Sequence, residues 1–164
     1  MNQINPIGLT REAWGPRFWK ILHTLAEYSG NQTNQILSND EVDAWILLLK
    51  SQAFVMPCAL CKQHYLEWQQ SHKLEGIKQL VGEKRREWIR KWLWACHKKV
   101  NEMNDKATPE LEVLPNMYKK QTIEKEYKEI LTMFQAAFNL QQLKSEDVNR
   151  WKLSLSRLRS MYGL

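Results

Sequence analysis

The sequence predicts an all-α fold of four core helices with a helical C-terminal extension, and three observations support this prediction. Apolar residues recur at three- and four-residue spacings along most of the chain, and no segment alternates apolar and polar residues for long. The 164 residues suffice for one domain with an appendage and for a sizeable core. The six glycines form no GxGxxG turn, which excludes a Rossmann-type dinucleotide site.

The first helix is expected over residues 13–28. Thr10 suits its N-cap, and Glu12 places a negative charge near the positive end of the helix dipole. Pro16 is compatible with this helix only because it lies in the first turn, where a missing N–H costs no hydrogen bond. Gly30 follows as the residue that ends the helix.

The second helix is expected to begin at Asn39, an N-cap residue followed by several acidic residues, and to run to about Phe54. Its nearly continuous apolar run over residues 44–49 predicts burial. Pro57 breaks the pattern and introduces a third helix over residues 58–71.

The rest of the chain continues the helical pattern. Pro109 and Pro115 mark a loop, and Ser145 with two acidic residues after it gives the last helix a clear start. The elements expected here are a connector or short helix within 71–82, with its helical part at 77–81, helices over 83–103, 116–139 and 145–161, and a loop over 105–115.

The formal net charge of +6 is spread along the chain: residues 1–104 carry 14 basic and 10 acidic side chains, and residues 105–164 carry 10 and 8. A nucleic-acid-binding protein usually concentrates basic residues on one face, so we expect no nucleic-acid partner. The densest basic run, residues 84–91, is expected to form a solvated helix face that needs no partner; the alternative is a role in attracting a phosphate-bearing ligand or an acidic protein.

Residues 1–9 have neither the basic nor the apolar segment of a signal peptide, and no apolar run approaches the ~20 residues that cross a bilayer. We therefore expect an intracellular protein without a membrane partner. In that setting a CxxC motif serves redox or metal chemistry more often than structural stapling.

The stretch Pro57-Cys58-Ala59-Leu60-Cys61 holds two of the three cysteines at the start of the third helix. Two intervening residues bring the sulfurs within reach of a disulfide, and a helix N-terminus stabilises a thiolate at Cys58, which favours thiol–disulfide exchange. The same spacing also binds zinc. In that alternative the ligands are Cys58, Cys61 and His64, with His72, Cys96 or His97 as a fourth; purely structural thiols are the third alternative.

Two further motifs flank this stretch. One precedes it, Trp14-Gly15-Pro16-x-x-Trp19-x-x-Leu22-His23, and one follows it, Trp92-Leu93 with His97-x-x-Val100-Asn101 and Lys106. In order and spacing, from about residue 10 to about residue 106, the three motifs resemble the Erv/ALR family of FAD-linked sulfhydryl oxidases. The resemblance implies a four-helix bundle with a short additional helix. It divides the chain into an FAD-binding sulfhydryl oxidase domain over 1–115 and a C-terminal helical extension over 116–164 that packs on it.

The resemblance also implies roles for individual residues. Cys61 would lie against the flavin, where it forms a charge-transfer thiolate, and Cys58 would exchange disulfides with the substrate. Two groups would hold FAD, one on the first helix and one on the fourth: Trp14, Gly15, Pro16, Trp19 and His23, then His97, Val100, Asn101 and Lys106. Arg11 and Tyr118 fall near positions that often touch FAD in the family, and no metal ligand is assigned.

The chain departs from the family pattern in two respects. His97 is followed by Lys98 where the family usually has Asn, so the hydrogen bond to FAD that the family makes there is not expected from this position. A second CxxC, which serves as a shuttle in many members, is not found in this sequence. Cys96 is expected to be a buried thiol, and His64 is expected to play a local polar role beside the disulfide.

The mechanism implied is oxidation of a substrate dithiol by the Cys58–Cys61 disulfide, with electrons passing to FAD and then to O2, which becomes hydrogen peroxide. Without a shuttle pair, Cys58 meets its substrate directly, which suggests a thioredoxin-like or small thiol protein. Short members of this kind resemble those encoded by large DNA viruses, which implies the host cytoplasm or the virion as location. Family members are usually homodimers through the first two helices, and the apolar run over residues 44–49 suits such a contact.

Overall fold

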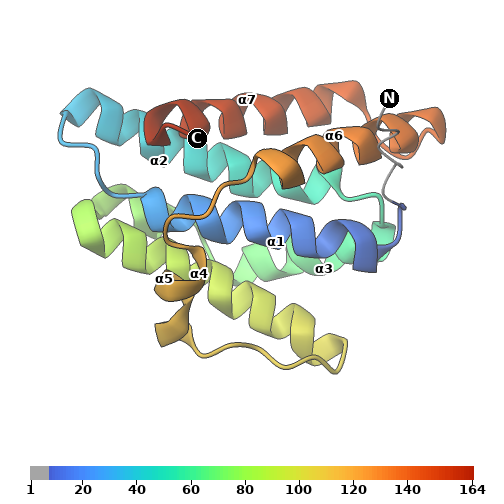
Figure 1. Ribbon diagram of the computed structural model, residues 1–164, viewed down its shortest axis with the longest axis horizontal. Helices are drawn as coiled ribbons and strands as arrows, with labels where there is room; N and C mark the ends of the chain where they lie inside the picture. Colours follow the sequence, from blue (N-terminus) through green and yellow to red (C-terminus); the bar gives the residue numbers. More distant parts are fainter. Residues whose placement is uncertain (1–7) are drawn as a thin grey trace.

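The computed structural model describes residues 8–164, and within this range it contains helices and no strand, which confirms the all-α prediction (Figure 1). The stretch considered for a signal peptide lies largely outside the described residues. The α-helices are α1 (Arg11–Tyr28), α2 (Gln35–Gln52), α3 (Ala59–Ser71), α4 (Gly82–Met103), α5 (Leu114–Tyr118), α6 (Glu124–Asn139) and α7 (Ser145–Tyr162). Short 3₁₀ helices are η1 (Ala53–Val55), η2 (Glu75–Gln79) and η3 (Leu111–Val113).

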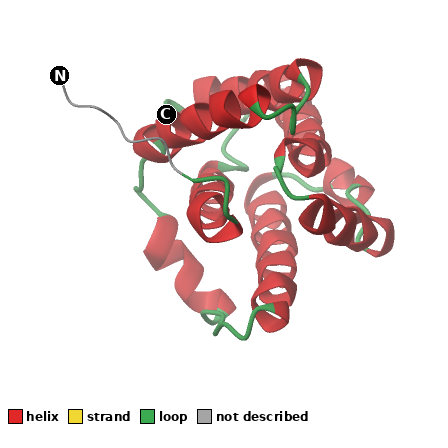
Figure 2. Ribbon diagram, turned by 90° about the vertical axis from the view of Figure 1, so that its right-hand side faces the viewer, coloured by secondary structure: helices red, strands yellow, loops and turns green. Residues whose placement is uncertain are grey.

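Helix α1 is the centre of the arrangement, because it contacts α4, α5, α6 and α7. Figure 1 shows α7 running alongside α2, with α6 between them and α1, while α3 and α4 lie on the other side of α1. The view turned by 90° shows these helices as rods around a common interior, with the loops at their ends (Figure 2). None of the helices within residues 8–164 has both the length and the hydropathy needed to cross a bilayer.

One hydrophobic core joins the early and late helices. Its fully buried members come from five of them: Leu25 on α1, Trp45 on α2, Ile89 on α4, Phe134 on α6 and Trp151 on α7. The last two helices therefore complete this core: α6 packs on α1, and α7 buries the apolar face of α2 within the same chain.

The first two helices begin earlier than their sequences predict. Helix α1 starts at Arg11, so Pro16 lies in the second turn and not the first; its position removes one helical N–H donor. Helix α2 is capped by Asn34 and not by Asn39. The side-chain oxygen of Asn34 accepts hydrogen bonds from the N–H groups of Ile36 and Leu37.

The single helix predicted over residues 116–139 is wrong, because the chain breaks it into α5 and α6. Lys120 lies in the left-handed region with φ of 69°, a conformation that a continuing α-helix does not contain. After this turn Ile123 is buried, and the hydroxyl of Tyr28 donates to the carbonyl of Gln121. These contacts fix the linker against the end of α1 and allow α6 to run back along it.

The basic run over residues 84–91 is not the solvated face that was expected. Arg85 is buried and donates to the buried carboxylate of Glu41 at 2.8 Å. Arg90 makes a two-pronged ion pair with Glu27, and the Nε of Arg86 donates to the carbonyl of Ser29. These arginines fasten α4 to α1 and α2, because their guanidinium groups point into the interhelical contacts and not into solvent.

The end of α7 joins the same polar network. The hydroxyl of Tyr162 donates to Glu41 at 2.7 Å and accepts from the indole N–H of Trp45 at 2.8 Å. Glu41 also accepts from the N–H of Gly30. The network thus ties the last turn of α7 to α2, to α4 and to the turn after α1.

Candidate functional site

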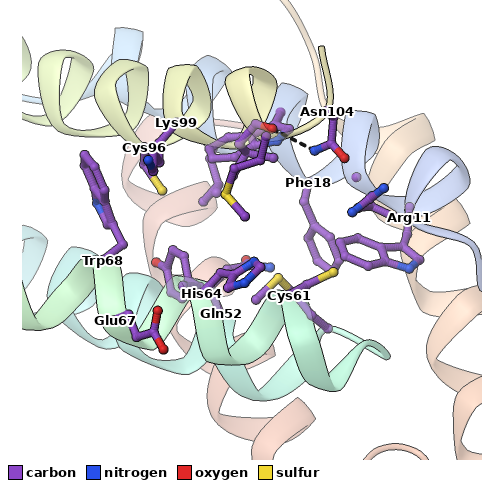
Figure 3. Close-up of a pocket in the computed structure, with 18 of the residues that line it drawn as sticks. Arg11, Phe18, Gln52, Cys61, His64, Glu67, Trp68, Cys96, Lys99 and Asn104 are labelled. Atoms are coloured by element: carbon purple, nitrogen blue, oxygen red, sulfur yellow. Dashed lines mark hydrogen bonds between the residues drawn. The ribbon is translucent and has the colours of Figure 1, made fainter. Parts of the chain in front are cut away.

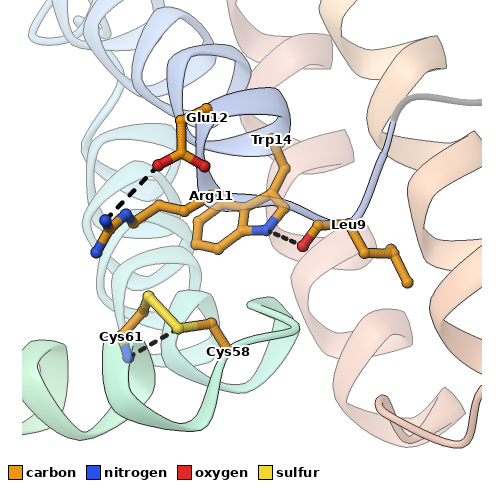
Figure 4. Close-up of a disulfide and its surroundings, with 6 residues drawn as sticks. All are labelled: Leu9, Arg11, Glu12, Trp14, Cys58 and Cys61. Atoms are coloured by element: carbon orange, nitrogen blue, oxygen red, sulfur yellow. Dashed lines mark hydrogen bonds and ion pairs between the residues drawn. A yellow bond between two sulfur atoms is a disulfide. The ribbon is translucent and has the colours of Figure 1, made fainter.

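Cys58 and Cys61 form a disulfide at the start of α3, with 5.3 Å between their Cα atoms. Cys58 is the N-cap residue and not a residue of the first turn, because its backbone is extended and Ala59 is the first helical residue. Its sulfur accepts a hydrogen bond from the N–H of Cys61 at 3.1 Å (Figure 4). A sulfur in this position faces the positive end of the helix dipole, which favours the thiolate of Cys58 once the disulfide is reduced.

A cavity of about 700 Å³ lies beside the disulfide, and Cys61 lines it whereas Cys58 does not. Its walls come from α1, α3 and α4 together with the end of α2 (Figure 3). The aromatic side chains that line it are Trp14, Phe18, Trp19, Tyr65 and Trp68. The volume and the mostly apolar lining are typical of sites that bind a large organic molecule.

The polar residues of the lining include the carboxylate of Glu67, and two groups of the lining are hydrogen-bond donors without a protein acceptor. Among residues 8–164, the buried indole N–H of Trp68 has no partner. The amide of Gln52 also lines the cavity, and only its oxygen is engaged in the described part of the chain. Arg11 and Lys99 add positive charge at the more exposed part of the lining. A bound anionic molecule with acceptor atoms would satisfy these groups.

An aromatic cluster adjoins the cavity through Trp19. The ring of Trp19 stacks on His97 with 4.1 Å between the centroids, and the ring of Tyr118 stacks on His23 at 5.0 Å. The Nε2 of His23 lies 3.1 Å from the Nδ1 of His97. Burial, together with the charge of His97, lowers the pKa of His23 to about 3. Burial and the charge of Lys106 lower the pKa of His97 to about 4, so both rings are neutral at pH 7.

The structure brings the predicted site residues to three places. Those that line the cavity are Arg11, Trp14, Gly15, Trp19, Cys61 and Val100. His23, His97 and Tyr118 belong to the adjoining aromatic cluster.

The other three predicted FAD ligands lie outside the cavity lining. Asn101 is buried and donates from Nδ2 to the carbonyl of Ala107 and the hydroxyl of Thr108, so it holds the loop after α4. Lys106 is exposed, as is Pro16. Direct contact of these three with a cofactor remains a prediction.

Several lining residues were not predicted as cofactor contacts, among them Gln52, Trp68, His72 and Lys99. Trp68 and His72 stand four residues apart on α3 and its C-cap, and their rings stack with 3.4 Å between centroids. That spacing was a usable signal, since it places two flat side chains on the face that carries Cys61. His64, expected to act locally beside the disulfide, also lines the cavity.

The zinc alternative finds no support. Cys58 and Cys61 are joined to each other, and residues 8–164 contain no group of three or more His, Cys, Asp or Glu side chains placed to hold a metal ion. The third cysteine, Cys96, is buried as expected and lines the cavity. Burial raises the pKa of its thiol far above the ordinary value.

Comparison with known families shows what this arrangement belongs to. The model of the Erv1 / Alr family matches residues 16–128. The chain is a member of the Erv1 / Alr family. The match begins inside α1, after the lining residues Arg11, Trp14 and Gly15, includes the disulfide with α3 and α4, and ends inside α6. Neither the curated proteins nor the solved structures contain a match to the chain.

Members of the Erv1 / Alr family are generally FAD-linked sulfhydryl oxidases, which take electrons from thiols and use O2 as acceptor. The residues of this chain fit such a cofactor. The cavity offers flat rings for stacking, unsatisfied donors at Trp68 and Gln52, and the cations Arg11 and Lys99 for phosphate oxygens. Cys61, one end of the disulfide, forms part of its wall, as oxidation of a thiol pair by a bound flavin requires.

Proposed function

We propose that the chain makes disulfide bonds in thiol proteins through a Cys58–Cys61 relay that delivers electrons to FAD and then to O2. One observation carries the proposal. Cys61 lines the cavity beside the disulfide, whereas Cys58 lies outside the lining at the N-cap of α3. We infer that Cys61 faces the bound cofactor and that Cys58, half-buried at the start of α3, receives the substrate from outside.

The first chemical step takes place between substrate and protein thiols. A substrate thiolate attacks the sulfur of Cys58, the Cys58–Cys61 bond breaks, and Cys61 leaves as a thiolate. A second substrate thiolate then attacks the substrate sulfur of the mixed disulfide, and Cys58 leaves as a thiolate. The substrate gains a disulfide and loses two protons and two electrons. The N–H of Cys61, which points at the sulfur of Cys58, stabilises the charge that Cys58 acquires in this second exchange.

A bound flavin supplies a two-electron acceptor for the reduced cysteine pair and a route from that pair to O2, which leaves as hydrogen peroxide. The predicted ligands that line its cavity are Arg11, Trp14, Gly15 and Trp19 on α1, Cys61 on α3 and Val100 on α4. Pro16, Asn101 and Lys106 are proposed to contact its outer part, with His23, His97 and Tyr118 as an aromatic wall. The apolar lining keeps water away from the cysteine next to it.

The proposed division of the chain places the FAD-binding oxidase domain at residues 1–115 and a helical extension at 116–164. The packing of α6 along α1 and of α7 along α2 supports an extension that docks firmly on the oxidase domain. A homodimer is also part of the proposal. Because α7 covers the apolar face of α2, the second copy must use a surface that α7 leaves free, and light scattering on the purified protein decides between one copy and two.

The proposed substrate is a thiol protein that meets Cys58 directly, such as a thioredoxin-like relay protein. Leu60, which is 57% exposed between the two cysteines, and the neighbouring exposed Phe54 support an apolar docking surface for a protein. We further propose that the chain resembles the short viral members of the family and acts in the host cytoplasm or the virion. Microscopy of the tagged chain tests the location.

Absorbance and thiol counts test the proposed function. The purified protein is expected to show the visible absorbance of a flavin, which bleaches when a dithiol is added without O2. Denatured protein is expected to contain one free thiol, Cys96, before reduction and three after it. Cys58→Ser and Cys61→Ser variants are expected to keep the flavin and lose dithiol oxidation. A colourless protein, or full oxidase activity in either cysteine variant, contradicts the proposal.

A further inference from the structure

The hydrogen bond between Trp151 and Gln52 links the C-terminal extension to the cavity. The indole N–H of Trp151 on α7 donates to the side-chain oxygen of Gln52 at 2.8 Å, across 99 residues of sequence. Gln52, the last residue of α2, lines the cavity beside Cys61 and is 3% exposed (Figure 3). A residue of the extension therefore contacts a polar group of the candidate redox site.

The chemistry of the two side chains fixes the orientation of the Gln52 amide. An indole N–H can only donate, so the amide atom that faces it must be the oxygen. The NH2 group of Gln52 then points away from Trp151. Within residues 8–164 it donates to no protein acceptor, and it is not among the fully buried unpaired groups. Its two N–H donors are available to a molecule in the cavity.

Trp151 is itself held in place by aromatic contacts. Its ring meets that of Phe18 edge to face, with 5.6 Å between centroids and 84° between planes. The ring of Phe134 on α6 meets it at 5.4 Å and 88°. Since Trp151 is fully buried between these rings, its N–H has one direction available. Gln52 thus receives a fixed partner, and its donor group is oriented before any molecule binds.

We propose that Gln52 is a cofactor contact and Trp151 its positioning residue: the extension orients the Gln52 amide so that it donates to the ring of the bound flavin and tunes its reduction. This inference rests on the proposed function. The polar edge of a flavin carries carbonyl oxygens and ring nitrogens that accept hydrogen bonds, and it gains negative charge on reduction. A donor held at that edge stabilises the reduced form and raises the midpoint potential.

Redox titration of the flavin-loaded variants tests the inference. Gln52→Leu is expected to lower the midpoint potential by the equivalent of about tenfold in the equilibrium constant, or ~30 mV for a two-electron couple. Trp151→Phe removes the indole N–H and keeps the ring packing, so a smaller shift in the same direction is expected. The double variant is expected to match Gln52→Leu alone, because Trp151 acts only through Gln52. The flavin absorbance maxima are expected to move in the same three proteins.

The control is Trp45→Phe. Trp45 is as buried as Trp151, its indole N–H makes a 2.8 Å bond between the same two helices, and it does not line the cavity. Its loss is expected to lower thermal stability and leave the midpoint potential and the spectrum unchanged. This comparison separates an effect on the cavity from a general loosening of the contact between α2 and α7.

The outcomes distinguish the two proposals. A wild-type protein that retains no flavin overturns the proposed function and this inference with it. A flavin-loaded Gln52→Leu protein with unchanged potential and spectrum overturns this inference alone, as does a Trp45→Phe shift equal to that of Trp151→Phe. If Trp151→Phe does not fold, the Gln52→Leu titration decides by itself. Loss of flavin from a folded Gln52→Leu protein, with Trp45→Phe still loaded, supports the contact.

Discussion

The Nε2 of His23 on α1 lies 3.1 Å from the Nδ1 of His97 on α4, in a contact between two rings that are both neutral at pH 7. One ring donates the N–H and the other accepts it, because two neutral imidazoles can share a proton only in this way. Burial is the main reason that both pKa values are low, and protonation of either ring places a charge beside the other.

This pair predicts a stability that falls in acid. In the unfolded chain each histidine binds a proton below its ordinary pKa of about 6.5, whereas in the folded protein the pKa values are about 3 and about 4. Between those limits the unfolded state binds more protons, so the free energy of unfolding rises with pH by up to about 1.4 kcal/mol per pH unit for each histidine. The gain is complete above about pH 6.5 and is lost progressively below it.

Chemical denaturation at several values between pH 4.5 and 7.5 measures this slope, in steps of about one unit. His23→Gln is expected to lower stability at pH 7. It is also expected to reduce the slope of unfolding free energy against pH by about the contribution of one histidine. If the slope of the variant equals that of the wild-type protein, His23 is not the group that titrates. The carboxylates of the ion pairs also make stability depend on pH at the acid end of the range. The test therefore compares the slope of the wild-type protein with that of His23→Gln.

The buried ion pair between Arg85 and Glu41 predicts a large loss of stability when only one partner is removed. The Arg85 side chain is 2% exposed and the Glu41 side chain 0%. Arg85→Met leaves the carboxylate without its cation, and the expected cost is about 3–5 kcal/mol in the free energy of unfolding. Arg85→Met combined with Glu41→Gln is expected to be more stable than Arg85→Met alone, because the uncompensated charge is gone.

An exposed ion pair provides the control for that experiment. Arg150 lies 3.6 Å from Asp147 on the surface of α7, with its side chain 64% exposed. Arg150→Met is expected to change the free energy of unfolding by less than about 1 kcal/mol. Equal losses of unfolding free energy in the Arg85→Met and Arg150→Met variants would mean that burial does not determine how much the Arg85–Glu41 pair contributes to stability.

Much of the fold follows from local signals in the sequence. The predicted and observed structures differ where contacts between residues far apart in the sequence determine the conformation. The CxxC site was predictable because its geometry is contained in five consecutive residues and one helix start. The start of α2 at Gln35 was not predicted. In the first turn after the Asn34 cap the apolar residues Ile36 and Leu37 are exposed, so they do not belong to the buried stripe of the helix. The inward direction of the Arg85 side chain could not be predicted, because its partner Glu41 lies on another helix.

The candidate site divides in the same way. Trp14, Trp19 and Cys61, which belong to the motifs, line the cavity, whereas Pro16 and Asn101 of the same motifs do not. Gln52 was missed, because its role depends on Trp151 at a separation of 99 residues. A glutamine at the end of an apolar helix carries no signal of its own until the partner that orients it is known.

Gly30 predicts a further stability effect at the turn between α1 and α2. Its φ is +81°, and a Cβ there would lie 2.2 Å from the carbonyl oxygen of Gly82, a backbone atom that cannot turn aside. Gly30→Ala is therefore expected to cost more than the ~1–2 kcal/mol of left-handed strain alone. Gly163→Ala is the matched control, because Gly163 has φ of +69° and open space around it. Thermal unfolding of the two variants compares them, and equal shifts would rule out the contact with Gly82.

The environments of the three cysteines predict an order of alkylation after mild reduction. Cys58 lies at the N-cap of α3, where the N–H of Cys61 points at its sulfur and favours the reactive thiolate. Cys61 lines the cavity and is expected to react after Cys58 in flavin-loaded protein. Cys96 is 2% exposed, and burial raises its pKa, so it is expected to react at least about tenfold more slowly than either.

Mass spectrometry of peptides from protein quenched at successive times after addition of iodoacetamide measures this order. Denatured protein is the control, because unfolding removes the helix N-terminus and the burial together, and the three rates are then expected to converge. Removal of the flavin is expected to speed the labelling of Cys61 and to leave that of Cys58 nearly unchanged, since only Cys61 lines the cavity. If Cys61 reacts before Cys58 in the loaded protein, the outward direction assigned to Cys58 is wrong, and substrate must enter the relay from the cavity side.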